Sequence, residues 1–132
     1  MPAGFYRLLS QCHCSFEEKE KLLPFIDKLC SYSEQARKEG LKSLEKRLQE
    51  IENPYLKYAM GLCIDSILEE ETYREVLLKW ILMADVKGYE LLEHLIIMEA
   101  VESIKQGENV RLMRNKLVSI LGEEMLEKVE EQ

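Results

Sequence analysis

The sequence has few of the residues that form the turns of a β-sheet or that build a catalytic centre. Among its 132 residues are only three prolines, six glycines and two histidines. No segment shows the strict alternation of polar and apolar residues that a half-buried strand requires. Good helix formers such as Glu, Lys, Leu and Met fill the long stretches instead. We therefore predict an all-α fold: an antiparallel bundle of four to five helices, compact or elongated.

Long apolar runs are also missing. The longest stretches, Val76–Val86 and Leu91–Val101, are interrupted by charged residues. Both are shorter than the roughly 18–20 residues that a membrane-spanning helix needs. The first ten residues have neither a basic start nor an apolar run, so no secretory signal is predicted. We expect no membrane insertion and a soluble, cytoplasmic protein.

Motifs of enzyme active sites are absent as well. The sequence contains no phosphate-binding glycine loop, dinucleotide fingerprint or nucleophile elbow. His13 lies near the start of the chain, and His94 lies in an apolar segment, where a packed histidine is commoner than a catalytic one. We predict a protein that is not an enzyme and uses no cofactor.

The cysteines leave one alternative open. Without export, Cys12, Cys14, Cys30 and Cys63 are expected to be reduced thiols. Cys12 and Cys14 flank His13, and this triplet would serve a metal-binding regulator. A tetrahedral zinc site normally takes two ligand pairs, and only one is present here. Ordinary loop and core cysteines are therefore favoured, and metal binding by Cys12 and Cys14 stays undecided.

The charge balance narrows the class of partner. The formal net charge is −7 and the isoelectric point is near 5.0. An acidic surface repels nucleic-acid phosphates and anionic lipids, so neither is predicted as a ligand. Another protein is the expected partner.

The order of the helices can be read from their start and stop signals. Residues 1–14 show no helical period and are predicted to be a flexible segment before a single helical domain, 15–132. Ser15 with Glu18 forms a capping box. From Pro24 to Ile51, apolar residues recur every three or four positions, which predicts one helix of about seven turns. Gly40 lies inside this helix, where close packing against a neighbouring backbone would compensate for its cost.

The remaining signals predict three or four further helices. Pro54 begins a helix that runs to about Ile67, with Tyr58 and Ile67 among its core candidates. A long pattern over residues 72–105 is divided near Gly88. Gly107 ends it, and Asn109 caps the next helix. Four Met and aromatic residues could form an adaptable binding groove, although core packing is the commoner role of such residues. They are Trp80, Met83, Met98 and Met113.

Two segments are more specific than their helical period. The first reads A-R-K-E-G-L-K-S-L-E over Ala36–Glu45 and continues through Asn53-Pro54-Tyr55 to Asp65. The second spans Ile97–Leu121; it reads I-K-Q-G-E-N-V-R over Ile104–Arg111, followed by Lys116-Leu117 and Leu121. In this order they resemble the cytoplasmic segments of MotA-type flagellar stator proteins, which carry A-R-x-x-G-L-x-x-L-E and I-x-x-G-E-N-P-R. The matched segments cover about half of the chain.

The chain departs from that family in two respects. MotA-type subunits have four membrane helices, and their last two lie between the matched segments. Here residues 67–88 occupy that place, and they are too short and too charged to cross a bilayer twice. The proline of the second motif is Val110 in this chain, so its preset first helical turn is lost. The resemblance therefore implies a cytoplasmic domain without membrane helices.

A function follows from the resemblance alone. It implies a non-enzymatic protein-interaction module that binds a flagellar motor component: the stator, the rotor protein FliG or a motor accessory protein. Lys46 falls where the family carries a basic residue facing the rotor, and Arg47 is beside it. Both side chains are expected to be exposed. Glu50 and Glu52 lie where the acidic counterpart is expected. The matched structural positions are Gly40, Pro54, Gly107 and Asn109.

Two alternatives to the motor-binding function remain open. The charged side chains could merely solvate a helix face, as most exposed charges do. The chain could also be a helical adaptor or self-assembling structural protein unrelated to motility. A homo-oligomer is compatible with either function.

Overall fold

The computed structural model describes residues 7–65 and 67–131 and confirms the all-α prediction. No strand occurs in this part of the chain. The chain is divided more finely than the sequence predicts, since a helical turn at residues 7–9 is followed by seven α-helices and one 3-10 helix. These are α2 (Phe16–Glu20), α3 (Leu22–Glu39), η1 (Leu41–Glu50), α4 (Pro54–Asp65), α5 (Glu70–Ala84), α6 (Gly88–Gln106), α7 (Val110–Ser119) and α8 (Glu123–Glu130).

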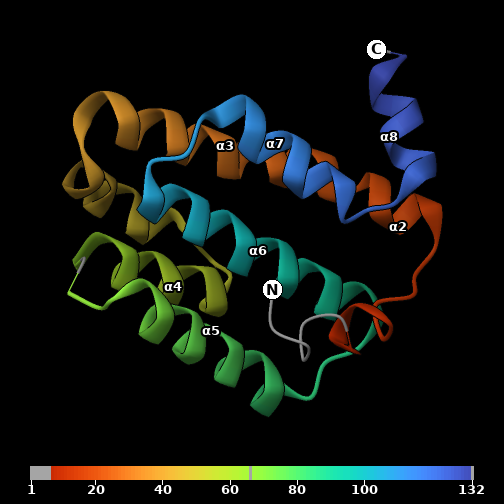
Figure 1. Cartoon of the computed structure of the whole chain (residues 1–132), viewed down its shortest axis with the longest axis horizontal. Coiled ribbons are helices and arrows are strands. Elements are labelled where there is room, and N and C mark those ends of the chain that lie inside the picture. Colours follow the sequence, from red (N-terminus) through yellow and green to blue (C-terminus); the bar gives the residue numbers. More distant parts are fainter. Residues whose placement is uncertain (1–6, 66, 132) are drawn as a thin grey trace.

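Helix α6 lies at the centre of the assembly. It packs against α3 and α7 on one side and against α4 and α5 on the other (Figure 1). Ten of its 19 residues are buried, and they lie all round the helix. A helix that is apolar on every side is stable in water only when other helices cover it. None of the helices in the described residues is long and apolar enough to span a membrane.

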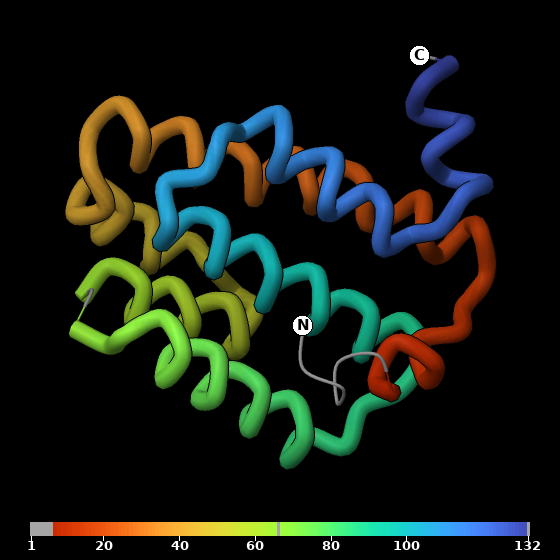
Figure 2. Tube along the Cα trace, in the orientation of Figure 1, coloured from red at the N-terminus to blue at the C-terminus, as the bar shows by residue number. Residues whose placement is uncertain are grey.

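The prediction of one continuous helix from Pro24 to Ile51 is wrong. Helix α3 ends at Glu39, and Gly40 adopts φ 90° and ψ 158°, a conformation that residues with a Cβ rarely enter. The chain then turns and packs η1 back against α3 (Figure 2). A Cβ built on Gly40 would meet no atom within 4 Å, so backbone conformation, and not close packing, requires this glycine.

Local side-chain chemistry sets several helix starts. The capping box of Ser15 and Glu18 is confirmed, with both reciprocal hydrogen bonds at 3.1 Å. Asn53 Oδ1 accepts the amide protons of Tyr55 and Leu56, while Pro54 occupies the first position of α4, where no amide proton is needed. Helix α4 therefore begins where its sequence predicts.

The predicted end of α4 and two of the predicted core residues differ from the structure. Helix α4 ends at Asp65, Ile67 is 79% exposed and Tyr58 is 40% exposed, so neither of the two is a core residue. The pattern over residues 72–105 is divided as predicted, because α5 stops at Ala84 and α6 starts at Gly88. Apolar spacing alone does not show which stripe a neighbouring helix covers.

Two buried tyrosines join α4 to α5. The hydroxyl of Tyr55 donates to the carbonyl of Leu77 at 3.0 Å, and the hydroxyl of Tyr73 donates to the carbonyl of Ala59 at 2.7 Å. Each helix thus supplies one donor and one acceptor to the other. Because both rings are almost completely buried, losing either acceptor would leave an unpaired hydroxyl in the core. The two hydrogen bonds thus fix α4 and α5 against each other.

Residues 7–14 lie against the helices. Leu8 and Leu9 pack on the core, Cys12 is 6% exposed, and the amide of Gly88 donates to the carbonyl of Gln11 at 3.0 Å. The rest of the segment predicted to be flexible, residues 1–6, lies outside the described residues. Its mobility stays a prediction.

The turn between α6 and α7 is capped from both sides. Gly107 ends α6 with φ 68°, and its amide donates to the carbonyl of Ile104. Asn109 Oδ1 accepts from the amides of Arg111 at 2.9 Å and Leu112 at 3.2 Å. A left-handed glycine followed closely by an N-cap asparagine satisfies backbone groups at both helix ends.

We expect Asn109→Ala to lower the free energy of unfolding by about 1 kcal/mol, because two amides at the start of α7 lose their acceptor. Urea denaturation followed by circular dichroism measures this. Asn115→Ala is the matched control, since Asn115 is exposed inside α7 and alanine favours a helix interior. Equal losses in the two variants would contradict the capping role.

Candidate protein-interaction surfaces

The four charged residues that the resemblance implies for partner binding lie in one short segment of the chain: Lys46, Arg47, Glu50 and Glu52. We define the η1 corner as η1 and residues 51–53, which lead into α4. Lys46, Glu50 and Glu52 are exposed there, while Arg47 is partly buried. The acidic and basic side chains thus share one surface, but they do not share one environment.

Arg47 joins η1 to α3 instead of facing solvent. Its guanidinium lies 4.1 Å from the centroid of the Tyr32 ring. It also donates to Gln35 Oε1 at 3.2 Å and to Ser31 Oγ at 3.3 Å. Only 25% of its side chain is exposed, although it reaches Glu50 at 3.9 Å. The expectation that both Lys46 and Arg47 are exposed is therefore wrong for Arg47.

A hollow of about 370 Å³ opens between the η1 corner and α3. Glu50 and Glu52 line it together with Lys28 of α3. Its apolar lining comes from three segments: Phe25 and Tyr32 of α3, Ile51 of the corner and Leu56 of α4. The hollow therefore combines an apolar surface with a rim of two carboxylates and one ammonium group.

A second, more apolar surface lies between α4 and α5. The ring of Tyr58 stacks on Trp80 at a centroid distance of 4.9 Å, and Trp80 in turn lies 5.6 Å from Tyr55. With Met83, which is 84% exposed, Tyr58 and Trp80 line a groove of about 570 Å³. We call it the α4–α5 groove. Among the described residues that line it, the charged one is Lys79.

The methionine and aromatic residues thus divide between the two roles considered from sequence. Trp80 and Met83 lie on the α4–α5 groove, whereas Met98 and Met113 are buried in the core. All four lie in helices, and the packing of those helices decides which of them are buried.

The two segments that resemble the stator family contact each other. The Arg37 guanidinium, at the end of α3, donates to the carbonyl of Gly107 at the end of α6. Helix α4 also packs along α6. Residues 36–65 and 97–121 therefore form one continuous part of the bundle.

Comparison of the chain with protein-family models, with curated proteins and with solved structures finds no match. The case for a function therefore depends on the residues and surfaces of this chain.

The second motif is held together by its own side chains. Glu108 accepts from Ser103 Oγ at 3.0 Å and pairs with Lys116 at 3.1 Å. Ser103 is buried in α6, and Lys116 belongs to α7, so Glu108 ties the two helices across their turn. Glycine, glutamate and asparagine at positions 107–109 all have structural roles here.

The cysteines and histidines do not converge. Among residues 7–65 and 67–131, no three His, Cys, Asp or Glu side chains are grouped to hold a metal ion. Burial raises the pKa of the Cys12 thiol to about 11, and its Sγ donates to the carbonyl of Leu8. The thiolate needed for metal ligation is therefore costly at this position. His94 stacks on Tyr55 at 4.9 Å, and its Nδ1 lies 2.7 Å from the carbonyl oxygen of Glu90.

We expect Arg47→Glu to lower the free energy of unfolding by about 1–3 kcal/mol, because it removes the cation–π contact with Tyr32 and two hydrogen bonds to α3. Lys46→Glu is the matched control, with the same charge change on an exposed neighbour, and should cost less than about 0.5 kcal/mol. Urea denaturation of the two variants measures the difference. Equal stability would show that Arg47 has no structural role.

Proposed function

We propose that this chain is a non-enzymatic protein-interaction module that binds a flagellar motor component through the η1 corner. The supporting observation is the hollow lined by Glu50 and Glu52, the acidic positions that the resemblance selects. The stator, the rotor protein FliG and a motor accessory protein are the candidate partners. The site of action would be the cytoplasm, at the periphery of the motor.

The shape and charge of the hollow indicate what it would accept. An apolar lining surrounded by polar groups is the usual arrangement of a binding hot spot, in which one anchoring side chain is buried. The two carboxylates favour a partner that places Arg or Lys beside that anchor. We therefore expect the occupant to be a segment with one large apolar side chain flanked by basic residues.

Arg47 and Lys46 would then have different tasks. Arg47 holds η1 against α3 and so fixes the positions of Glu50 and the hollow. Lys46 is exposed and available to an acidic group of the partner. Exposed charges contribute mainly to orientation and partner choice, whereas the apolar anchor contributes more of the affinity.

The test uses purified FliG, stator cytoplasmic domain and motor accessory protein from the same cell. We expect at least one to bind, and Glu50→Lys with Glu52→Lys to weaken that binding about tenfold by repelling the basic segment. Calorimetric titration measures the affinity. The matched control is Glu127→Lys with Glu130→Lys, the same charge change on exposed residues of α8. No binding of any motor protein, or equal affinity in the two double variants, would contradict the proposal.

The alternative function, a helical adaptor outside the motor, is favoured by the α4–α5 groove. Exposed Tyr, Trp and Met side chains are typical of surfaces that bury a partner helix. Because Lys79 is the charged residue of the lining, the fitting occupant is an amphipathic helix that carries a carboxylate beside its apolar face.

Trp80 is the only tryptophan, so its fluorescence reports on this groove alone. We expect a synthetic amphipathic helix with leucine anchors and one glutamate to shift the Trp80 emission to shorter wavelength as the ring loses water. Met83→Lys should abolish the shift, whereas Leu112→Lys, on an exposed apolar residue of α7, should leave it intact. Unchanged emission in the wild type would exclude this occupant. A homo-oligomer in light scattering that Met83→Lys disperses would instead assign the groove to a second copy.

A further inference from the structure

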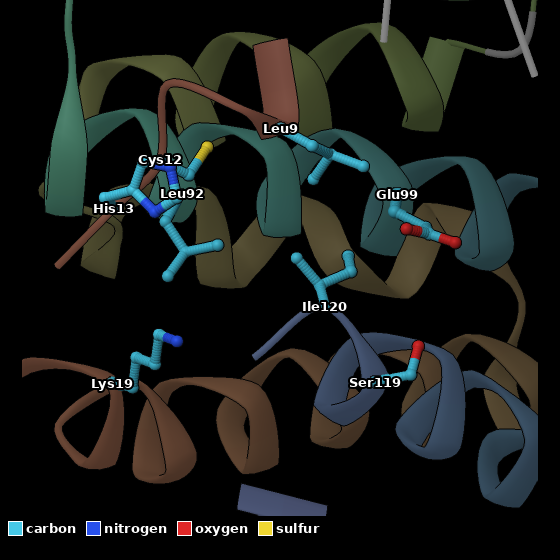
Figure 3. Close-up of a pocket in the computed structure, with 8 residues that line it drawn as sticks. All are labelled: Leu9, Cys12, His13, Lys19, Leu92, Glu99, Ser119 and Ile120. Atoms are coloured by element: carbon cyan, nitrogen blue, oxygen red, sulfur yellow. The ribbon is translucent and has the colours of Figure 1, made fainter. Parts of the chain in front are cut away.

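A third hollow, of about 400 Å³, lies away from both interaction surfaces. Figure 3 shows the side chains that line it. Leu92 and Glu99 come from α6, Ser119 and the adjoining Ile120 from the end of α7, Lys19 from α2, and Leu9, Cys12 and His13 from the segment before it. Four separate segments therefore meet around one space whose volume suits a small molecule.

One end of this hollow holds an unsatisfied carboxylate oxygen. Oε2 of Glu99 is buried and accepts no hydrogen bond from the described residues. Burial raises the pKa of the Glu99 carboxyl, Glu102 and Glu108 add to the rise, and Lys116 opposes it. A carboxylate with one oxygen buried and without a donor is poorly solvated, so a cation in the hollow beside it would stabilise its charge.

The other carboxylates of α6 show that this is a local feature. Glu102 accepts a two-pronged contact from Arg74, and Glu93 accepts from Asn53 Nδ2 at 3.1 Å. Lys116, whose charge opposes the rise in the pKa of Glu99, is already engaged by Glu108. Glu99 alone among these three acidic side chains has an oxygen buried without a donor in the described part of the chain.

The opposite end of the hollow is basic. Lys19, His13 and Leu92 lie at the end away from Glu99, and Ile120 lies between the two ends (Figure 3). In the described residues Lys19 makes no ion pair within 4.0 Å, since the seven pairs present involve other side chains. Leu92 and Glu99 are seven residues apart, which is about 10 Å along a helix.

We propose that this hollow binds a small aliphatic zwitterion, with its ammonium group against Glu99 and its carboxylate against Lys19. The ammonium would pair with the part of the Glu99 carboxylate that lines the hollow, and Ser119 at the same end could accept a further proton from it. The aliphatic body would lie on Leu9, Leu92 and Ile120, which replace water around the methylene groups. Each part of the ligand thus has a counterpart in the lining.

The test compares three probes: aminocaproate, which carries both charges, hexylamine, which has only the amine, and hexanoate, which has only the acid. We expect calorimetric titration to show aminocaproate binding more tightly than either of the others. Perturbed NMR signals from the methyl groups of Leu9, Leu92 and Ile120 would place it in the hollow. Absence of binding at millimolar concentrations, or binding that leaves these methyl signals unchanged, would overturn the proposal.

Two variants separate the charged ends. Glu99→Gln keeps the side-chain shape and Lys19→Met keeps the aliphatic stem, and each should weaken aminocaproate binding about tenfold. Glu90→Gln, on an exposed residue of α6 outside the lining, is the control and should bind as the wild type does. Unchanged affinity in Glu99→Gln, or hexylamine binding as tightly as aminocaproate, would overturn the assignment of the two ends. The Lys19→Met variant keeps the test valid if Glu99→Gln alters folding.

Discussion

The burial of α6 on all sides is the constraint on which the rest of the structure depends. Its Leu, Ile, Met and Val side chains point outward in every direction, and fully burying one such side chain contributes about 1.5–3 kcal/mol. Helices α3, α4, α5 and α7 are positioned by covering it. Polar residues of α6 then need partners from those same helices, and Arg74 and Asn53 provide them for Glu102 and Glu93. The hollow beside Glu99 lies where this covering is incomplete.

Helix starts could be predicted from sequence because they depend on neighbours along the chain. Ser15, Asn53 and Asn109 each accept protons from amides two or three residues ahead, so spacing alone identifies them. The break at Gly40 could not be predicted in this way. A glycine is tolerated inside a helix, and the apolar residues after it continue at the intervals of three and four that predict an α-helix.

The same misreading explains the error at Arg47. A 3-10 helix has three residues per turn, so Leu41, Leu44 and Arg47 share the face that turns towards α3. In an α-helix, which has 3.6 residues per turn, Arg47 would lie outside the apolar stripe and face solvent. The hollow at the η1 corner could not be predicted either. Lys28 and Phe25 of α3 line it together with Glu50 only because the chain reverses at Gly40.

The residues of the two motifs differ in whether the fold itself explains them. Gly107, Glu108 and Asn109 close the turn between α6 and α7, and glycine at a helix end followed by an N-cap asparagine is common wherever two helices are joined. In the described part of the chain, Lys46 and Glu52 form no ion pair and Glu50 pairs with Arg47 of the same 3-10 helix, so these charges do not join two helices as Glu108 does.

The charge of the whole chain bears on the choice between the two interaction surfaces. A net charge of −7 attracts basic segments and repels acidic ones before contact. The η1 corner, with Glu50 and Glu52, adds to that attraction, whereas the α4–α5 groove must draw a carboxylate to Lys79 against the overall field. Salt screens such effects beyond about 8 Å at physiological ionic strength, so the advantage lies in the approach of the partner. Association through the corner should therefore be faster and more sensitive to salt.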